Sequence, residues 1–132
     1  MLKYIGSYLF GNINSKRRHS IEIIYSCKEK ELFSNLELMK KKLRIEHIKV
    51  IIKRIKQLQA YNNFQELLNS SIGKPERLTN SDYYSLRIDK NYRLIIKPAI
   101  EFYSKENFIM CESVEIKGVV DYHGGKNNWL IK

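Results

Sequence analysis

The spacing of apolar residues changes along the chain, from a helical period to a period of two near residue 83. Between Gly11 and Gly73 there is no glycine, and the first proline is Pro75, so this interval is predicted to be mostly helical. Two apolar stripes at helical spacing predict two helices, and the second is expected to end near Asn62-Asn63. The first stripe is Leu32, Phe33, Leu36, Met39 and Leu43, and the second is Ile48, Ile51, Ile52, Ile55 and Leu58.

From Tyr83 onward, apolar and polar residues alternate in two short runs, which predict an antiparallel hairpin around the loop Asp89-Lys90-Asn91. The apolar set must lie on one face, and this fixes the register. It pairs Ile88 with Tyr92, Arg87 with Arg93 and Leu86 with Leu94. Both arginines should therefore project from the face opposite the helices.

Two further strands are predicted, at Val114–Asp121 and at Ile21–Tyr25, from their β-branched and alternating residues. The order of elements predicts an α+β domain with two N-terminal helices packed on one face of a small, mainly antiparallel sheet. The other face should be open to a ligand. The length of 132 residues fits a single domain, with a core at about 20–125 and no clear role for residues 1–19.

The chain is strongly basic, with 24 Lys and Arg against 14 Asp and Glu, a formal net charge of +10. Such an excess favours a polyanionic partner, with nucleic acid first. Eight basic residues between 40 and 56 face only Glu46, and this stripe is either a solvated helix face or a direct RNA contact. They are Lys40, Lys41, Lys42, Arg44, Lys49, Lys53, Arg54 and Lys56.

Composition also bounds the location of the protein and its use of metals. Cys27 and Cys111 lack the spacing of a zinc site or the density of a disulfide scaffold, which favours a reduced, cytoplasmic protein. No apolar run approaches the roughly 18 residues that span a bilayer. The Tyr4–Phe10 stretch, interrupted by Gly6 and Ser7, is not typical of a signal peptide. We expect no metal, no cofactor and no membrane partner.

The Arg87–Arg93 pair is the first candidate for chemistry. Like charges directly opposite each other destabilise a sheet, and a phosphodiester would relieve that repulsion. The alternative is a purely structural face on which the arginines splay apart or pair with Asp89 or Glu115.

The second candidate is Asp121-Tyr122-His123, at the end of the last predicted strand and beside Gly124-Gly125. His123 can act as a general acid or base near neutral pH, Tyr122 can stack on a base, and Asp121 can orient the imidazole or accept a proton. The alternative is an exposed histidine without a role. His19 and His47 receive that second interpretation.

Several motifs in order resemble the RelE/HigB toxins of the RelE/ParE superfamily, and the terminal Asp-Tyr-His is HigB-like, as in plasmid maintenance killer proteins. The resemblance covers about residues 20–125, leaving 1–19 and 126–132 outside. The motifs are Gly73-Lys74-Pro75-Glu76-Arg77-Leu78, Tyr83-Tyr84-Ser85-Leu86-Arg87-Ile88, Asn91-Tyr92-Arg93-Leu94-Ile95-Ile96 and Val119-Val120-Asp121-Tyr122-His123-Gly124.

The resemblance implies a microbial-ribonuclease-like domain that acts as the toxin of a type II toxin–antitoxin system. Such a toxin enters the ribosomal A site and cleaves messenger RNA without a metal ion, which inhibits translation. Its partner would be a HigA-like helix-turn-helix antitoxin, and operator DNA would be bound only through the toxin–antitoxin complex. The ribose 2′-hydroxyl would attack its own phosphate in this endoribonuclease (mRNA interferase) reaction.

Carried onto matching positions, the resemblance makes Arg93 the phosphate-binding arginine, with Arg87 a basic residue one strand earlier. The catalytic segment is Asp121, Tyr122 and His123, and His123 or Asp121 is the expected proton-transfer group. Lys74 and Arg77 are expected substrate-binding residues.

One departure from the family concerns the loop before the hairpin. Some HigB toxins carry a histidine and a lysine there, where this chain has Glu76, Arg77, Leu78 and Thr79. Arg77 is the expected substitute for the missing basic residues.

Two other functions remain open: a ParE-like toxin that inhibits gyrase, and a non-catalytic basic module that binds RNA or the ribosome. A ParE-like toxin has no use for a catalytic terminal histidine. The ribonuclease interpretation instead requires the hairpin guanidinium groups and the His123 imidazole to converge on one phosphate.

Overall fold

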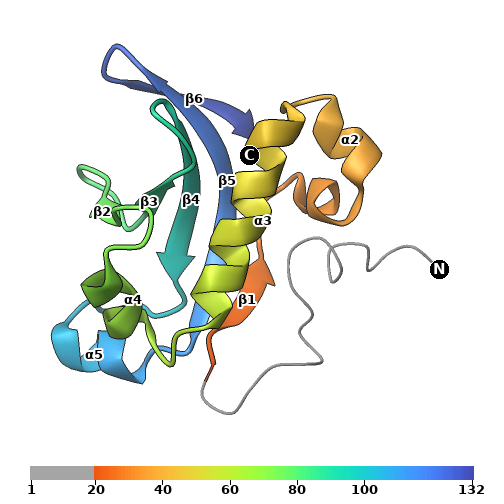
Figure 1. The fold of residues 1–132 in the computed structure, drawn as a ribbon. Helices are drawn as coiled ribbons and strands as arrows, with labels where there is room; N and C mark the ends of the chain where they lie inside the picture. Colours follow the sequence, from red (N-terminus) through yellow and green to blue (C-terminus); the bar gives the residue numbers. More distant parts are fainter. Residues whose placement is uncertain (1–19) are drawn as a thin grey trace.

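The computed structural model describes residues 20–132, which form a six-stranded, mainly antiparallel sheet with a long helix across one face (Figure 1). The strand order is β1-β5-β4-β3-β2, and β6 also pairs with β5. The strands are β1 (Glu22–Tyr25), β2 (Glu76–Arg77), β3 (Tyr84–Arg87), β4 (Tyr92–Pro98), β5 (Ser113–His123) and β6 (Lys126–Ile131). Residues 1–19, including Tyr4–Phe10 and His19, lie outside the described residues.

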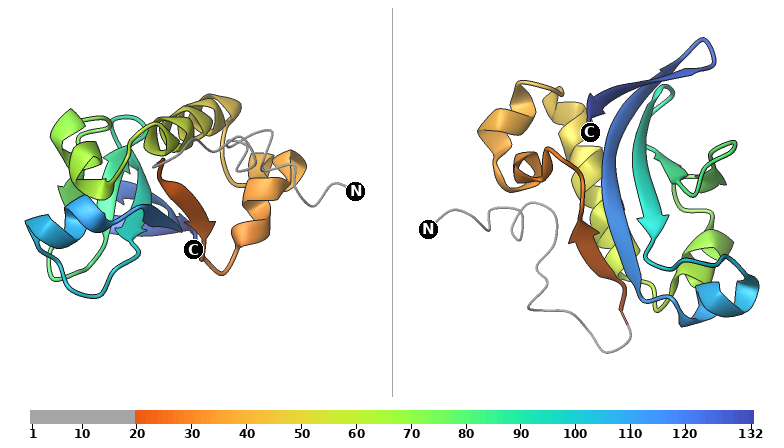
Figure 2. Two further views of the ribbon diagram at one scale, coloured as in Figure 1. Left: turned by 90° about the horizontal axis from the view of Figure 1, so that it is seen from below. Right: turned by 180° about the vertical axis from the view of Figure 1, so that it is seen from behind.

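The long strand β5 organises the sheet, because it pairs along its length with β4 on one side and with two strands on the other. The parallel strand β1 takes its first half and the antiparallel strand β6 takes its second half. Figure 2 shows β6 and β1 following each other along this edge. The backbone amide of Glu29 also donates to the carbonyl of Lys132, at 2.9 Å, which ties the end of β6 to the segment after β1.

The second predicted helix is α3 (Ile45–Gln59), and its apolar stripe faces the sheet. Ile48, Ile51, Ile55 and Leu58 are fully buried in the same core cluster as Leu86 and Leu94 of the sheet. The hydrophobic pattern therefore predicted this helix and its buried face correctly. None of the helices among residues 20–132 is long and apolar enough to cross a membrane.

The prediction of the first helix as a single element is wrong. The segment is divided into a 3-10 helix η2 (Lys30–Ser34) and a short helix α2 (Leu36–Lys40). Asn35 causes the break, because its backbone is extended and its side chain accepts a hydrogen bond from the Leu38 amide. Asparagine is a preferred N-cap, so it starts a new helix where the apolar spacing alone suggested continuity.

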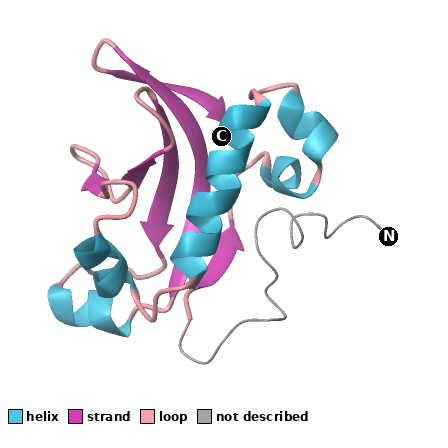
Figure 3. Ribbon diagram, in the orientation of Figure 1, coloured by secondary structure: helices cyan, strands magenta, loops and turns pink. Residues whose placement is uncertain are grey.

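Two short helices between the strands complete the fold (Figure 3). Asn63 caps α4 (Phe64–Ser70) and Ser104 caps α5 (Lys105–Met110), and neither helix was predicted. Their aromatic residues Phe64 and Phe108 pack edge to face, with ring centroids 5.1 Å apart. The α+β class is therefore confirmed, but of the two predicted N-terminal helices only α3 is long.

The predicted hairpin register is confirmed, with Leu86 opposite Leu94 and Arg87 opposite Arg93. The strand β6, in contrast, was not predicted, although Ile131 is fully buried. Gly118 allows β6 to close onto β5, because a Cβ at this position would lie 2.0 Å from the carbonyl oxygen of Ile131. Its φ of 145° is also one that other residues rarely adopt.

Candidate nucleic-acid interface

The register divides the side chains of the hairpin between two faces, because cross-strand partners in a sheet project to the same side. Leu86 and Leu94 point into the core beneath α3. Arg87 and Arg93 therefore project from the opposite side, here called the outer face. Outer-face positions in the central strands are Ser85, Arg87, Arg93, Ile95, Val120 and Tyr122. Ser85, Ile95 and Val120 are buried there, so this face is less open than the sequence suggested.

A surface pocket of about 370 Å³ lies beside the arginines on the outer face. Lys74, one of the expected substrate-binding residues, lines it, and Glu76 is the one carboxylate of the described residues that does so. The loop before β2 is held against the hairpin because the Arg87 amide donates to the Gly73 carbonyl at 2.7 Å. The lining residues are Leu68, Ser71, Lys74, Pro75, Glu76, Ser85, Arg87 and Arg93.

The guanidinium of Arg93 is anchored through one nitrogen at the tip of the hairpin. Its Nη1 donates to the carbonyl oxygens of Asp89 at 3.0 Å and Lys90 at 3.1 Å, and to its neighbour Tyr92 at 3.2 Å. Within residues 20–132 no hydrogen bond uses its Nε or Nη2. Arginine binds phosphate through two such donors in one plane, and this geometry leaves them available.

Tyr122 belongs to the same face as Arg93. The guanidinium carbon lies 5.8 Å from the centre of the Tyr122 ring, within the range of a cation–π contact. The Tyr122 side chain remains exposed. The structure therefore brings together four of the predicted residues on or beside the outer face, namely Lys74, Arg87, Arg93 and Tyr122.

The expected convergence of the arginines with His123 on one phosphate is not what the structure shows. Asp121 lies opposite Tyr92, whose ring stacks on His47 of α3 at a centroid distance of 4.0 Å, so Asp121 projects to the helix side. His123 follows two residues later, and its Nδ1 lies 2.7 Å from Oδ1 of Asp121. The physical reason is strand alternation, which places Tyr122 on one face and both of its neighbours on the other.

Arg77 is likewise separated from the outer-face arginines. It pairs with Tyr84, a core residue of the helix side, and its guanidinium donates to the carbonyl of Ser81 and pairs with Asp82. Its guanidinium carbon lies 5.0 Å from the ring centre of Tyr103. The structure therefore gives Arg77 local partners away from the pocket that Lys74 and Glu76 line.

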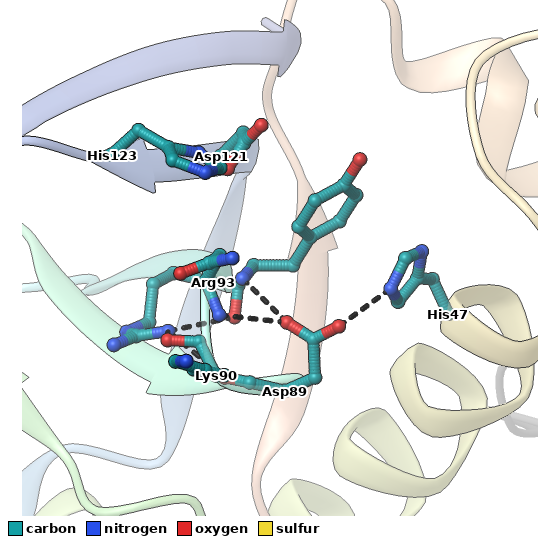
Figure 4. A network of polar contacts seen from close by, with 8 residues as sticks. His47, Asp89, Lys90, Arg93, Asp121 and His123 are labelled. Carbon is teal, nitrogen blue, oxygen red and sulfur yellow. Dashed lines mark hydrogen bonds and ion pairs between the residues drawn. The ribbon is translucent and has the colours of Figure 1, made fainter.

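His47 corrects a second expectation, because it is buried rather than exposed. Its Nε2 lies 2.6 Å from Oδ2 of Asp89, and its Nδ1 is buried without a hydrogen-bond partner among the described residues. The other carboxylate oxygen, Oδ1 of Asp89, accepts from the amides of Asn91 at 2.9 Å and Tyr92 at 2.7 Å. Figure 4 shows Asp89 between His47 and the hairpin tip that holds Arg93.

These contacts also set the ionisation of Asp89. Partial burial by itself would raise the pKa of Asp89, but hydrogen bonds from the Tyr92 and Asn91 amides and from His47 outweigh it. The pKa of Asp89 is therefore lowered from its usual value. A charged carboxylate thus stabilises the loop at the hairpin tip.

Glu76 and His47 were both missed by sequence reasoning. Glu76 was treated as a loop residue, and its only signal was its place after Lys74-Pro75 and before the alternating run. His47 stands four positions before Ile51, on the same face of α3, which was a signal that it faces the sheet. Within residues 20–132 no group of three or more His, Cys, Asp or Glu side chains could hold a metal ion.

Comparison with known proteins identifies no relative: no family model matches the chain, and no significant match was found among curated proteins or solved structures.

Proposed function

We propose that this protein is an RNA-cleaving toxin of the RelE/HigB kind, which inhibits translation by cutting messenger RNA on its outer face. The observation that carries the proposal is Arg87 directly opposite Arg93, beside a pocket lined by Lys74 and Glu76. A sheet designed only for stability would avoid two like charges in register. A phosphodiester bound between them would offset their repulsion.

The proposed chemistry needs no protein nucleophile. The ribose 2′-oxygen attacks the adjacent phosphorus and the bond from phosphorus to the 5′-oxygen breaks, leaving a 2′,3′-cyclic phosphate and a 5′-hydroxyl. Glu76 accepts the proton of the 2′-hydroxyl, because it is the one carboxylate of the described part of the chain that lines the pocket with the two arginines. Arg87 and Arg93 balance the charge that develops on the phosphorane.

The leaving 5′-oxygen must receive a proton, and Tyr122 is the proposed donor. Its ring contacts Arg93 on the outer face, whereas His123 projects to the helix side. The Asp121–His123 pair nevertheless lies at the same end of the sheet, beside the tip of the hairpin (Figure 4). There it would contact the RNA strand where the strand leaves the outer face.

Single-stranded RNA is the proposed substrate, since unpaired bases can stack on exposed aromatic rings. Tyr122 has 43% of its surface exposed, and Trp129 pairs with Val120, an outer-face residue. An arginine pair flanked by aromatic rings suits a strand that presents its phosphates and its bases together. A ribosome-bound message would present such a strand, and a helix-turn-helix antitoxin remains the proposed partner.

A non-catalytic RNA-binding or ribosome-binding module is the second candidate, and one observation favours it. Lys49, Lys53 and Lys56 are exposed along α3, and no ion pair within residues 20–132 involves them. Such a stripe binds phosphates without cutting them. A ParE-like gyrase inhibitor is supported by nothing comparable.

Controlled expression separates these functions. The wild-type gene and Arg93→Ala, Glu76→Gln and Lys53→Ala variants would be induced from a repressed promoter, with growth and RNA ends followed. The ribonuclease proposal predicts growth arrest with cut messages for wild type and Lys53→Ala, and neither for the other two variants. Growth arrest by the wild-type protein without cut messages would favour the non-catalytic module and overturn the proposal.

A further inference from the structure

We infer that His47 is a positioning residue for Arg93, acting through Asp89; this inference rests on the proposed function of the outer face. His47 lies on the helix side of the sheet and cannot touch a substrate bound at the outer face. Its influence would pass through the hairpin loop. No motif of the sequence drew attention to this residue.

The first step is the hydrogen bond from α3 to the loop. The Nδ1 of His47 is buried without a partner among residues 20–132, so the ring hydrogen belongs on Nε2, which donates to Oδ2 of Asp89 at 2.6 Å. The His47 ring is held by stacking on Tyr92, with an angle of 21° between the ring planes. This stacking therefore fixes the direction in which Nε2 of His47 donates.

The hairpin loop connects Asp89 to Arg93. Oδ1 of Asp89 accepts from the amides of Asn91 and Tyr92, so a single carboxylate joins α3 to the hairpin turn. The carbonyls of Asp89 and Lys90 in that turn accept from Nη1 of Arg93. The orientation of these carbonyls determines where the remaining donors of Arg93 point. His47 thus reaches Arg93 through two successive sets of hydrogen bonds.

A second contact from the same helix supports this arrangement. Arg54 lies seven positions after His47, close to two helical turns, and its Nε donates to the carbonyl of Arg87 at 2.8 Å. Helix α3 therefore holds the hairpin at the Arg87 strand as well as at its tip. The spacing of Arg87 and Arg93, on which a shared phosphate depends, is supported from behind by one rigid element.

The test compares two substitutions of His47 that remove different properties. His47→Phe keeps the ring that stacks on Tyr92 and removes the donor, whereas His47→Gln keeps a donor of similar reach and removes the ring. Binding would be measured by fluorescence anisotropy with a short 2′-O-methyl oligoribonucleotide, which cannot be cleaved. The Asp89 side chain is 42% exposed, so water can replace the lost donor and the fold should survive.

We expect His47→Phe to weaken binding about fivefold, as the loss of one hydrogen bond would, and His47→Gln to restore most of it. In an Arg93→Ala background, His47→Phe should have no further effect. Amide hydrogen exchange at Asn91 and Tyr92 should accelerate in His47→Phe only, a local change that a general loss of stability would not produce. If His47→Phe does not fold, Asp89→Asn takes its place with the same expectations.

The outcomes distinguish this inference from the proposed function. If Arg93→Ala weakens binding but His47→Phe does not, or if the two losses add, the inference is overturned and the proposed function stands. If Arg93→Ala leaves binding unchanged, the outer face is not the RNA site and both are overturned. Loss in both single variants without further loss in the double variant supports both.

Discussion

Arg87 and Arg93 stand directly opposite each other on the outer face, and no ion pair within residues 20–132 involves either side chain. This repulsion gives a prediction about stability. Arg87→Thr should increase the free energy of unfolding by about 0.5 kcal/mol, because an unfavourable cross-strand pair is replaced by a good strand former. Urea denaturation of the two proteins at low salt measures it, and a less stable variant would contradict it.

The same substitution should weaken RNA binding. A hydrogen bond to a charged group contributes ~1.5–3 kcal/mol, so Arg87→Thr should lower affinity for the 2′-O-methyl oligonucleotide by at least about tenfold. The slope of log affinity against log salt should fall by about 0.7, the amount expected for one phosphate contact on a single strand. Lys53→Ala on α3 is the control for general charge loss, and an equal effect there would argue against a specific outer-face site.

Proton transfer can be assigned by comparing substitutions on the two faces of β5 and in the pocket. Glu76→Gln should reduce the cleavage rate by roughly 10²–10⁴-fold, the usual contribution of a general base. Tyr122→Phe should also reduce it, while His123→Ala should retain more activity than either. A loss in His123→Ala as large as in Glu76→Gln would contradict the assignment of proton transfer to Glu76 and Tyr122 alone.

The lowered pKa of Asp89 predicts a specific dependence of stability on pH. A carboxyl whose pKa is lower in the folded state than in the unfolded state stabilises the fold above the unfolded value, about 3.9. That contribution is lost as the pH falls below this value through the folded pKa. Acid titration of the free energy of unfolding should therefore show a smaller decline in Asp89→Asn than in wild type. Equal declines would mean that Asp89 carries no such linkage.

Gly118 offers a test of the sheet edge. Gly118→Ala should lower the free energy of unfolding by about 3 kcal/mol, because its φ is unfavourable for alanine and the added methyl meets the Ile131 carbonyl. Gly124→Ala is a matched control, since a Cβ there meets nothing within 4 Å although its φ is also positive. If the two variants are equally stable, β6 does not close on β5 as described.

The sequence predicted those parts of the fold in which one face is buried and the pattern is strictly periodic. Helix α3 and the β3–β4 hairpin follow from such patterns, and the turn between Ile88 and Tyr92 fixed the register. The division of the first helix was missed because asparagine is tolerated inside a helix. Only the structure shows that the Asn35 side chain caps the start of α2. Strand β6 was missed because Lys126, Asn127 and Asn128 give it no alternation.

The candidate site was only partly predictable, for a geometric reason. Sequence proximity suggested that Asp121, Tyr122 and His123 act together, yet strand alternation sends Tyr122 to one face and its neighbours to the other. Glu76 joins the arginines only through its pairing with Ser85, a contact between residues that no local pattern relates. The role of His47 depends in the same way on its hydrogen bond with Asp89, which lies 42 positions later in the sequence.

The most direct test of the account is to map RNA ends after induction of the wild-type protein and of the Glu76→Gln and Arg93→Ala variants. Cleavage at the outer face should give new fragments from wild type that carry 2′,3′-cyclic phosphate and 5′-hydroxyl ends, and none from either variant. Growth arrest without new RNA ends, or the same ends from the variants, would contradict cleavage at the outer face.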